Sequence, residues 1–334
     1  MAELRDRLDI TVEELEESLG ANKLPRFIES SEKLFVDRID TIINDILSDP
    51  RKRAICVSGP TSSGKTTFTM RLSSGLNRHG KKAFFLSLDD YYTVRDLTFD
   101  RDGRPDFETI EALDIERAAN DIKRILNQEA VTPPHFNFMT RQVEEGTDTI
   151  LLPEDGVLVV EGLHGLSSRI TGGIDDALIA KVFIMPYGNV YADSKLMDSN
   201  EIRLLRRIVR DNRHRSAHAL STIDYWPMIE RSEEDYYTDY LTRADYHVNS
   251  FLAYESLIIA PMALADIRAA QKQALDGTIA PNIFMDRSNT GKPFADLNKA
   301  LARAGKLVEH LEKIPVVDPK LVPEVSILNE FIGS

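Results

Sequence analysis

The stretch VSGPTSSGKTTF at Val57–Phe68 constrains the fold of this chain more than any other part of the sequence. It overlaps a short apolar run, Ala54–Ser58, that is typical of a buried strand, and it leads into a helical stretch at 66–79. The glycines at 59 and 64 allow a turn in which successive backbone N–H groups point inward. A strand, a glycine-rich turn and a helix in this order indicate the first unit of a parallel α/β sheet.

This turn has the spacing GxxxxGK[ST], and it lies where that pattern holds a phosphate, between a strand and a helix. The N-terminus of the helix adds its dipole. Lys65 supplies a positive charge to the β- and γ-phosphates of a nucleotide, and the Thr66 hydroxyl can bind Mg²⁺. We therefore predict a site for ATP and Mg²⁺ with the phosphate-binding residues Gly59, Ser62, Ser63, Gly64, Lys65, Thr66 and Thr67. The structural alternative is a glycine-rich turn without a ligand.

Other apolar runs continue this alternation of strands and helices. Four further runs have the length and composition of strands, and helical stretches lie between them. These runs are Ala83–Leu88, Gly156–Gly162, Lys181–Met185 and Asp245–Ser250. Such alternation predicts a parallel sheet whose two faces are both covered. We expect an α/β protein of the P-loop NTPase fold, in which helices flank a parallel sheet, with an arginine-rich lid and helical additions at both ends.

Composition and charge exclude several classes of protein. Of 334 residues only Cys56 is a cysteine, which excludes a disulfide framework and fits a reducing compartment. The net charge of −13 argues against a nucleic-acid partner. The most apolar stretch, Leu257–Ala265, is shorter than the roughly 20 residues that a membrane span needs, and the acidic N-terminus does not resemble a signal peptide. We expect a cytoplasmic protein without a membrane span, and a homo-oligomer is left open.

Three classes of nucleotide-binding protein are compatible with the glycine-rich turn. The NKxD pattern of a GTPase is not in the sequence, and the strand that ends at Glu161 lacks the Asp-Glu pair usual in a motor ATPase. A small-molecule kinase needs a carboxylate near the γ-phosphate. Asp89 and Asp90 provide one at the carboxyl end of a strand, where open sheets bind ligands. Such an aspartate can also simply cap a turn.

An arginine-rich helix is the third feature that indicates chemistry. Six arginines lie within thirteen residues: Arg203, Arg206, Arg207, Arg210, Arg213 and Arg215. Residues three or four apart share a helix face, so several of these guanidinium groups can surround a transferring phosphate. The alternative is a solvated face that pairs with Glu201, Asp211 and other acids.

The remaining histidines and aromatic residues of this region do not indicate a site. His214 and His218 lack the companion ligands of a zinc site. We interpret Trp226 and the nearby tyrosines as packing residues.

In this order, these motifs resemble those of the uridine kinase and phosphoribulokinase family. The resemblance covers about residues 52–250, and the C-terminal residues 326–334, SILNEFIGS, are similar to those of a bacterial uridine kinase-related group. The residues that carry it are GPTSSGKTT (59–67), LSLDDYY (86–92), RPDFET (104–109), PHFNFMTR (134–141), VVEGLHGL (159–166) and RLLRRIVRD (203–211).

The resemblance implies roles for matched residues. Asp89 resembles the base that takes the proton from the acceptor hydroxyl, and Thr66, Glu161 and Asp89 resemble the magnesium ligands. Tyr92 and Asp106 match acceptor-binding residues, with Asp106 on sugar hydroxyls. The lid arginines that close over the phosphate correspond to Arg207, Arg210 and Arg215, of which we assign Arg207 and Arg210 to catalysis with Lys65, and Arg215 to the nucleotide.

The departures from the family lie in the acceptor site. Where uridine–cytidine kinases have a tyrosine and a histidine that read the pyrimidine, this chain has Phe136 and Arg141, and Ala217 replaces the second lid arginine. Phe136 can still stack on a base, whereas Arg141 only donates hydrogen bonds. The resemblance therefore supports the donor chemistry more strongly than it identifies the acceptor.

From these features we expect three regions and one reaction. Residues 1–50 form an N-terminal helical extension, residues 51–273 a P-loop kinase domain, and residues 274–334 a C-terminal helical extension with an extended tail. The predicted reaction moves the γ-phosphate of ATP to a hydroxyl of a small sugar-containing acceptor. The first candidate for this acceptor is a ribonucleoside, and we expect the enzyme to have a relaxed preference for its base. The alternatives are a sugar or sugar-phosphate kinase, and a nucleotide-binding regulatory protein without transfer.

Overall fold

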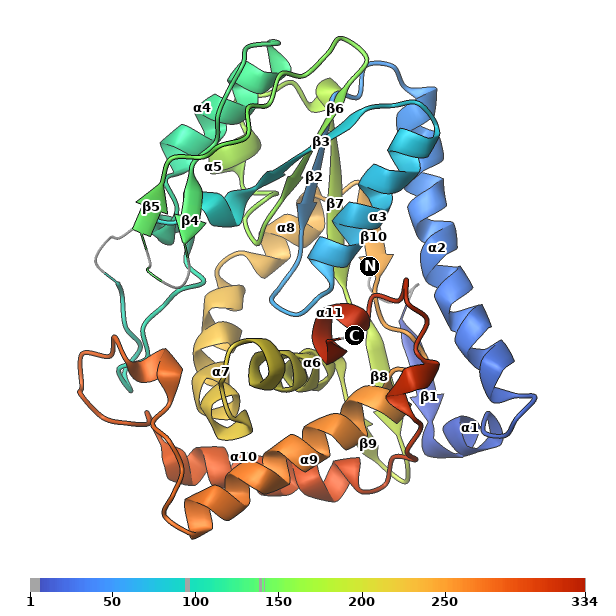
Figure 1. The fold of residues 1–334 in the computed structure, drawn as a ribbon, viewed down its shortest axis with the longest axis vertical. Coiled ribbons are helices and arrows are strands. Elements are labelled where there is room, and N and C mark those ends of the chain that lie inside the picture. The colour runs from blue at the N-terminus through green and yellow to red at the C-terminus, as the bar shows by residue number, and fades with distance from the viewer. Residues whose placement is uncertain (1–6, 94–96, 138–139, 141, 334) are drawn as a thin grey trace.

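The computed structural model describes residues 7–93, 97–137, 140 and 142–333, and its centre is a sheet of five parallel strands (Figure 1). The strands lie in the order β10 (Tyr246–Asn249), β7 (Ile179–Met185), β2 (Ala54–Ser58), β6 (Val157–Glu161) and β3 (Ala83–Ser87). The predicted α/β fold is confirmed. The predicted strands agree with the observed ones to within about two residues at each end.

Side chains alternate along each strand, so both faces of the sheet are apolar and need a cover. In β2, Ile55 and Val57 belong to the core on one face, and Ala54 and Cys56 to the core on the other. On the first face lie α2 (Leu24–Ser48) and α3 (Lys65–Arg78). On the second face lie α4 (Ile115–Leu126), α5 (Ser168–Thr171) and α8 (Tyr237–Arg243).

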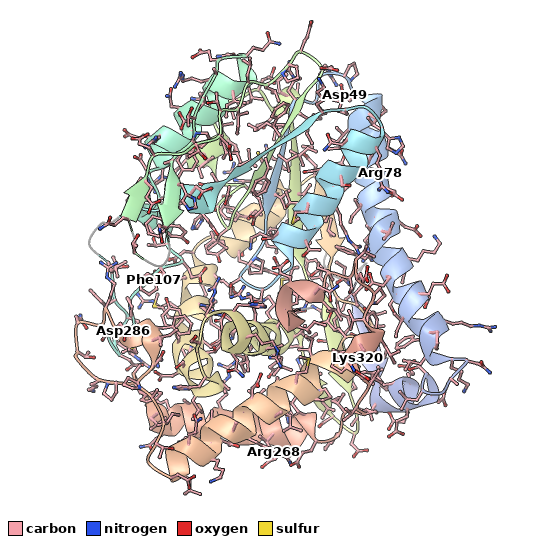
Figure 2. All side chains as sticks on the ribbon, in the orientation of Figure 1. Asp49, Arg78, Phe107, Arg268, Asp286 and Lys320 are labelled. Atoms are coloured by element: carbon pink, nitrogen blue, oxygen red, sulfur yellow. The ribbon has the colours of Figure 1, made fainter. Side chains whose placement is uncertain are left out.

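The long helix α2 packs along α3, the helix that begins at the glycine-rich turn (Figure 1). The rings of Phe35 and Phe68 meet edge to face between them, with 6.3 Å between ring centroids. Asp49, just after α2, and Arg78, the last residue of α3, lie at the same end of the molecule (Figure 2). The predicted N-terminal helix therefore supports α3 from its outer side.

A layer of helices covers the other end of the molecule. It consists of α6 (Ser199–His214), α7 (Ala219–Glu234), α9 (Ser256–Leu275) and α10 (Leu297–Leu311), which pack on one another. The arginine-rich stretch is α6, and its side chains at 202–209 are all buried. The short helix α11 (Asn329–Ile332) packs on α6 close to the beginning of α3 (Figure 1).

A second, smaller sheet joins the N-terminal extension to the middle of the chain. β1 (Leu8–Thr11) pairs in parallel with β8 (Gly188–Tyr191), which forms a hairpin with β9 (Lys195–Met197). The expectation of an all-helical extension is therefore incomplete, although α1 (Val12–Glu17) and α2 are helical. A strand of four residues is too short for the alternation of its apolar and polar side chains to predict it from the sequence. A separate hairpin is formed by β4 (His135–Asn137) and β5 (Gln142–Glu144).

The predicted region boundaries at 50/51 and 273/274 stay predictions. The second of them falls inside α9. Residues of both additions, such as Ile39 and Phe331, belong to the same hydrophobic cluster as β2. The end of the chain is not simply extended, since α11 is helical and the side chains of Ile327, Leu328 and Phe331 are completely buried. None of the described helices has the length and apolarity that crossing a membrane requires.

Candidate active site

Three neighbouring strands place the predicted site residues at one edge of the sheet. β2 lies between β6 and β7, and β6 lies between β2 and β3. Glu161, the last residue of β6, is in register with Val57 on one side and Ser87 on the other. The glycine-rich turn therefore begins beside Glu161, and Asp89 follows two residues after Ser87. Ligands bind at this carboxyl edge of parallel sheets.

The glycine-rich turn, here called the phosphate loop (Gly59–Thr66), needs its two glycines. Gly64 has φ of +87°, a left-handed conformation that glycine adopts without strain. A Cβ atom at Gly59 would lie 2.2 Å from the backbone oxygen of Ile184, so a larger residue would push β7 away. These contacts explain the loop's path from the end of β2 to the beginning of α3.

The phosphate loop has the features that a phosphate group requires. The hydroxyl oxygens of Ser62 and Ser63 are buried and have no hydrogen-bond partner within the described structure. The Lys65 ammonium donates to Pro60 O at 3.2 Å and so lies over the loop. Thr66 lies exposed in the first turn of α3. Unpaired donors, a helix N-terminus and a lysine together fit the phosphates of a nucleotide.

Helix α6 holds the phosphate loop from behind. The guanidinium of Arg203 donates to Thr61 O at 3.4 Å, and that of Arg206 donates to Ser62 O at 3.3 Å. Arg207 donates to the Thr61 hydroxyl at 3.0 Å. The shared face that spacing predicts is therefore directed at the loop, and it positions the loop's backbone.

Arg203 and Arg206 are structural residues, so these two of the six arginines are not free to surround a transferring phosphate. Arg203 forms a two-point ion pair with Glu233, and Arg206 forms one with Glu255. Both arginines are almost completely buried. A buried guanidinium needs such a partner because leaving water is costly for a charge.

The predicted lid arginines Arg207, Arg210 and Arg215 converge on one carboxylate, Asp211. The Arg207 and Arg210 guanidiniums donate to it at 2.9–3.0 Å, and that of Arg215 lies 3.6 Å away. These three charges hold the pKa of Asp211 below its ordinary value despite its burial. The neighbouring Arg210, with burial, lowers the pKa of Arg215 to about 10. Arg215 is the exposed member and can reach a ligand most easily.

The adjacent carboxylates Asp89 and Asp90 have different surroundings. Asp90 accepts from the His135 ring at 2.9 Å and from the Phe136 N–H at 3.3 Å, so it fixes the β4–β5 hairpin. Asp89 lies in the single turn η1 (Leu88–Tyr91) and is exposed. The protein atoms around it displace water from the carboxylate and raise its pKa, while Lys65 partly opposes this rise.

Glu161 and Lys65 complete a cluster of charges with Asp89, here called the strand-end cluster. Burial raises the pKa of Glu161 to about 8, although Lys65 lowers it, and Asp89 raises it further. The described residues contain no group of three or more carboxylate, His or Cys side chains that would hold a metal alone. One or two carboxylates with a hydroxyl suit Mg²⁺, which keeps water and phosphate oxygens as its other ligands.

Two of the predicted acceptor residues, Tyr92 and Phe136, lie near the adjacent carboxylates Asp89 and Asp90. The Tyr92 hydroxyl donates to Phe107 O at 3.2 Å, and the rings of Tyr92 and Phe136 pack with centroids 5.7 Å apart. Phe136 is buried, with 8% of its surface exposed, which limits its face for a base. Asp106 accepts from the Ser232 hydroxyl at 2.9 Å. Arg141, the predicted base-reading residue, lies outside the described residues.

A cavity of about 330 Å³ opens beside Asp106 and is rich in acidic side chains. Its polar lining residues include Asp106, Glu111, His164, Arg169, Asp235 and Tyr236. The His164 ring is hydrogen-bonded to Tyr240 and to Glu108 O, and burial lowers the pKa of His164 to about 4. His164 is therefore neutral near pH 7 and serves as a polar wall of the cavity.

Some residues of the site were not found from the sequence. Arg104 anchors the Asp106 loop to α7 by donating to Asp224 O at 2.6 Å, and it also pairs with Asp100 and Asp102. Glu108 lies 3.4 Å from Arg207. Both residues belong to the motif RPDFET (104–109). The motif indicated that this segment belongs to the site, but it did not show what Arg104 and Glu108 each do. Glu330, from the end of the chain, carried no signal of its own.

The parallel sheet with a phosphate loop at its centre defines a P-loop α/β protein. Residues 54–252 match the model of the phosphoribulokinase/uridine kinase family, which is more than half of the chain, and the chain belongs to that family.

Individual relatives are distant from this chain. A uridine kinase from Leuconostoc citreum (strain KM20) is 27% identical over 179 residues, which are 52% of this chain and 74% of the relative. A solved structure of a possible uridine kinase from Bacillus stearothermophilus is 18% identical, with a TM-score of 0.39, over 63% of this chain and 97% of that one.

Proposed function

We propose that this protein is a kinase that moves the γ-phosphate of ATP to a hydroxyl of a small, uncharged, sugar-containing acceptor, with a ribonucleoside as the first candidate. The observation that carries the proposal is the register of three strands. It brings the phosphate loop, Glu161 and Asp89 to one edge of the sheet. Membership of the phosphoribulokinase/uridine kinase family supports it.

The roles follow from the charges around the strand-end cluster. The N–H groups and hydroxyls of the phosphate loop bind the phosphates, and Lys65 balances the charge that develops on the transferring group. Mg²⁺, when bound through Thr66, Glu161 and Asp89, would neutralise phosphate charge. Asp89 accepts the proton of the attacking hydroxyl, because it is exposed beside Lys65 and is not engaged by the β4–β5 hairpin as Asp90 is. Arg210 and Arg215 supply further positive charge that attracts the phosphate.

The acidic cavity favours an uncharged acceptor over a sugar phosphate. Asp106, Glu111 and Asp235 line it, and Arg169, the one arginine among the described residues of the lining, is paired with Glu111 at 2.5 Å. Carboxylates bind sugar hydroxyls as acceptors, and they repel a second phosphate group. The sugar-phosphate alternative therefore has less support from this cavity than the nucleoside.

Base preference is proposed to be relaxed. Of the residues that replace base-reading groups, Phe136 offers a ring that is largely buried and cannot form a hydrogen bond through its side chain, Ala217 is buried, and Arg141 lies outside the described residues. A site that hydrogen-bonds a particular base rejects others strongly, because its own polar groups are then unpaired. Stacking tolerates any base. Several ribonucleosides should react with comparable kcat/KM.

The test is acceptor-dependent release of ADP with the common ribonucleosides, their deoxy forms, ribose and ribulose 5-phosphate. Comparable rates among ribonucleosides support the proposal. A preference for uridine and cytidine above about a hundredfold, or roughly 2.7 kcal/mol of transition-state binding, contradicts the relaxed preference. Activity with the sugar phosphate alone makes this a sugar-phosphate kinase. Nucleotide binding without transfer to any acceptor favours the regulatory alternative.

A further inference from the structure

The end of the chain reaches the proposed nucleotide site. Glu330 lies in α11, and its carboxylate oxygen Oε2 accepts two hydrogen bonds from Thr67, the residue after the phosphate loop. One comes from the Thr67 backbone N–H at 3.1 Å and the other from its hydroxyl at 3.0 Å. Residues 67 and 330 are far apart in sequence, so a specific arrangement of the segment 326–333 (the C-terminal segment) makes this contact.

The two donors of Thr67 are those that a phosphate would use. Thr67 lies in the first turn of α3, where backbone N–H groups have no partner within the helix. Such N–H groups after a glycine-rich turn hold the α- and β-phosphates of a bound nucleotide. A carboxylate and a phosphate oxygen cannot both occupy hydrogen-bond distance from one N–H, and their like charges repel. Glu330 therefore stands where a phosphate group is expected.

The rest of the C-terminal segment fixes Glu330 in this position. Ile327 touches the phosphate loop, since a Cβ atom at Gly64 would lie only 2.3 Å from its Cδ1. The Arg206 guanidinium lies 4.9 Å from the centre of the Phe331 ring. The Ser326 and Tyr254 hydroxyls are 3.1 Å apart in the core. The segment is thus seated on the same helix that supports the phosphate loop.

We propose that Glu330 is a built-in competitor of the nucleotide at Thr67, and that its departure is required before the α-phosphate binds. The inference rests on the proposed function, because it takes the phosphate loop to be a nucleotide site. The chain then exists in two states, with Glu330 on Thr67 or away from it. The apparent affinity for nucleotide is reduced by the fraction in the first state. The C-terminal segment thereby sets the nucleotide concentration at which the site fills.

The decisive experiment measures ADP binding by calorimetry, without any acceptor. In Glu330→Gln the charge is lost while the size is kept, and in Glu330→Ala the competing group is removed. We expect ADP to bind about tenfold more tightly to both, if the contact holds most molecules in the first state. Affinity within twofold of the natural chain, or weaker affinity, would overturn the proposal and leave Glu330 as a simple helix-capping residue.

A matched control separates this contact from a change in overall charge. Glu324→Gln removes the same charge from an exposed position shortly before the C-terminal segment. It should leave ADP affinity unchanged. Thermal melting without nucleotide shows whether each variant is folded, and the near-isosteric glutamine variant carries the test if alanine unfolds the chain. Equal gains in the Glu324 and Glu330 variants would contradict the proposal.

Failure of this inference is distinguishable from failure of the proposed function. ADP that binds the Glu330 variants more tightly, in a protein that transfers no phosphate to any acceptor, supports competition and contradicts the kinase. Acceptor-dependent transfer with unchanged ADP affinity in the variants does the reverse. ADP that binds neither the natural chain nor the variants overturns both.

Discussion

Two clusters of charge adjoin the phosphate loop, and they differ in balance. On the α6 side, Arg203, Arg206 and Arg207 meet Glu233, Glu255 and Asp211, one carboxylate for each guanidinium. On the sheet side, the strand-end cluster sets two carboxylates, Asp89 and Glu161, against the single ammonium of Lys65. In the first cluster each of these guanidiniums has a carboxylate partner, and Arg203 and Arg206 are held by two-point hydrogen bonds. Asp211 is also shared with Arg210 and Arg215. The second cluster is crowded with negative charge.

This difference separates charges that hold the fold from charges that do chemistry. Balanced pairs keep the pKa values of arginines at or above their ordinary range, as for Arg203 and Arg207 despite burial. In the strand-end cluster, burial raises the pKa values of Asp89 and Glu161, and neighbouring carboxylates raise them further. Groups with such shifts are candidates for proton transfer and metal binding. Four substitutions test whether the two clusters divide stability and activity in this way.

The largest effect is expected from Lys65→Ala. The substitution removes the only positive charge of the strand-end cluster, so transfer activity should be lost and ATP binding weakened, because nothing then balances the β- and γ-phosphates. Steady-state kinetics and ATP titration measure both. Near-normal turnover in a folded variant would mean that the phosphate loop is not the phosphate site.

Asp89→Asn should lower turnover by about 10²–10⁴-fold, the usual contribution of a positioned general base. ATP affinity should stay within a few-fold of that of the natural chain. The matched control is Asp90→Asn, since Asp90 holds the β4–β5 hairpin and should affect turnover less. If the Asp90 variant is crippled and the Asp89 variant is active, the neighbouring carboxylate is the base.

Arg206→Ala should act on stability, with a cost of about 3–5 kcal/mol in the free energy of unfolding. It leaves the buried carboxylate of Glu255 without its partner. Denaturant unfolding measures the change. The control is Arg243→Ala, whose ion pair with Asp239 is exposed and should contribute less than about 1 kcal/mol. Equal small effects for both variants would show that the α6 cluster is not holding the fold.

Glu161→Gln should have only a small effect on stability near pH 5, and that effect should grow as the pH rises. Glu161 has a pKa of about 8 in the fold against an ordinary value of 4.5. The native state therefore keeps a proton that the unfolded chain has lost, and stability falls as pH rises through this window. Glutamine cannot ionise, so the stability of the variant does not fall in this way. The free energy of unfolding of the variant should therefore rise relative to that of the natural chain by up to about 1.4 kcal/mol per pH unit between these two pKa values.

Unfolding midpoints at pH 5 and pH 8.5 would measure this trend. Exposed Glu309→Gln serves as the control and should show no such divergence. A constant difference between Glu161→Gln and the natural chain across the range would mean that Glu161 ionises at an ordinary pH.

The parallel sheet and the phosphate loop were predictable because their signals are local. The run Ala54–Ser58 is buried on both faces and therefore apolar throughout, and Gly59 and Gly64 have fixed spacing before a lysine. The carboxyl edge of the sheet then brings Asp89 and Glu161 together without further information. Predictions for these residues followed from their positions at the ends of strands and from their chemistry.

Other parts depended on partners distant in sequence. Spacing placed Arg203 and Arg206 on a face but could not show that Glu233 and Glu255 neutralise them. The contact of Glu330 with Thr67 depends on how α11 packs against α6, which no local pattern expresses. The same holds for Asp106, whose partner Ser232 comes from α7.

The pairing of β1 with β8 has a consequence for how the chain is made. Asn189 of β8 donates to Asp9 of β1 across a separation of 180 residues. At ordinary rates of synthesis, β1 leaves the ribosome on the order of ten seconds or more before its partner exists. A strand edge exposed for that long can pair with another chain. The acidic residues of the neighbouring helix α1, Glu13 and Glu14 among them, would repel a second nascent copy during this interval.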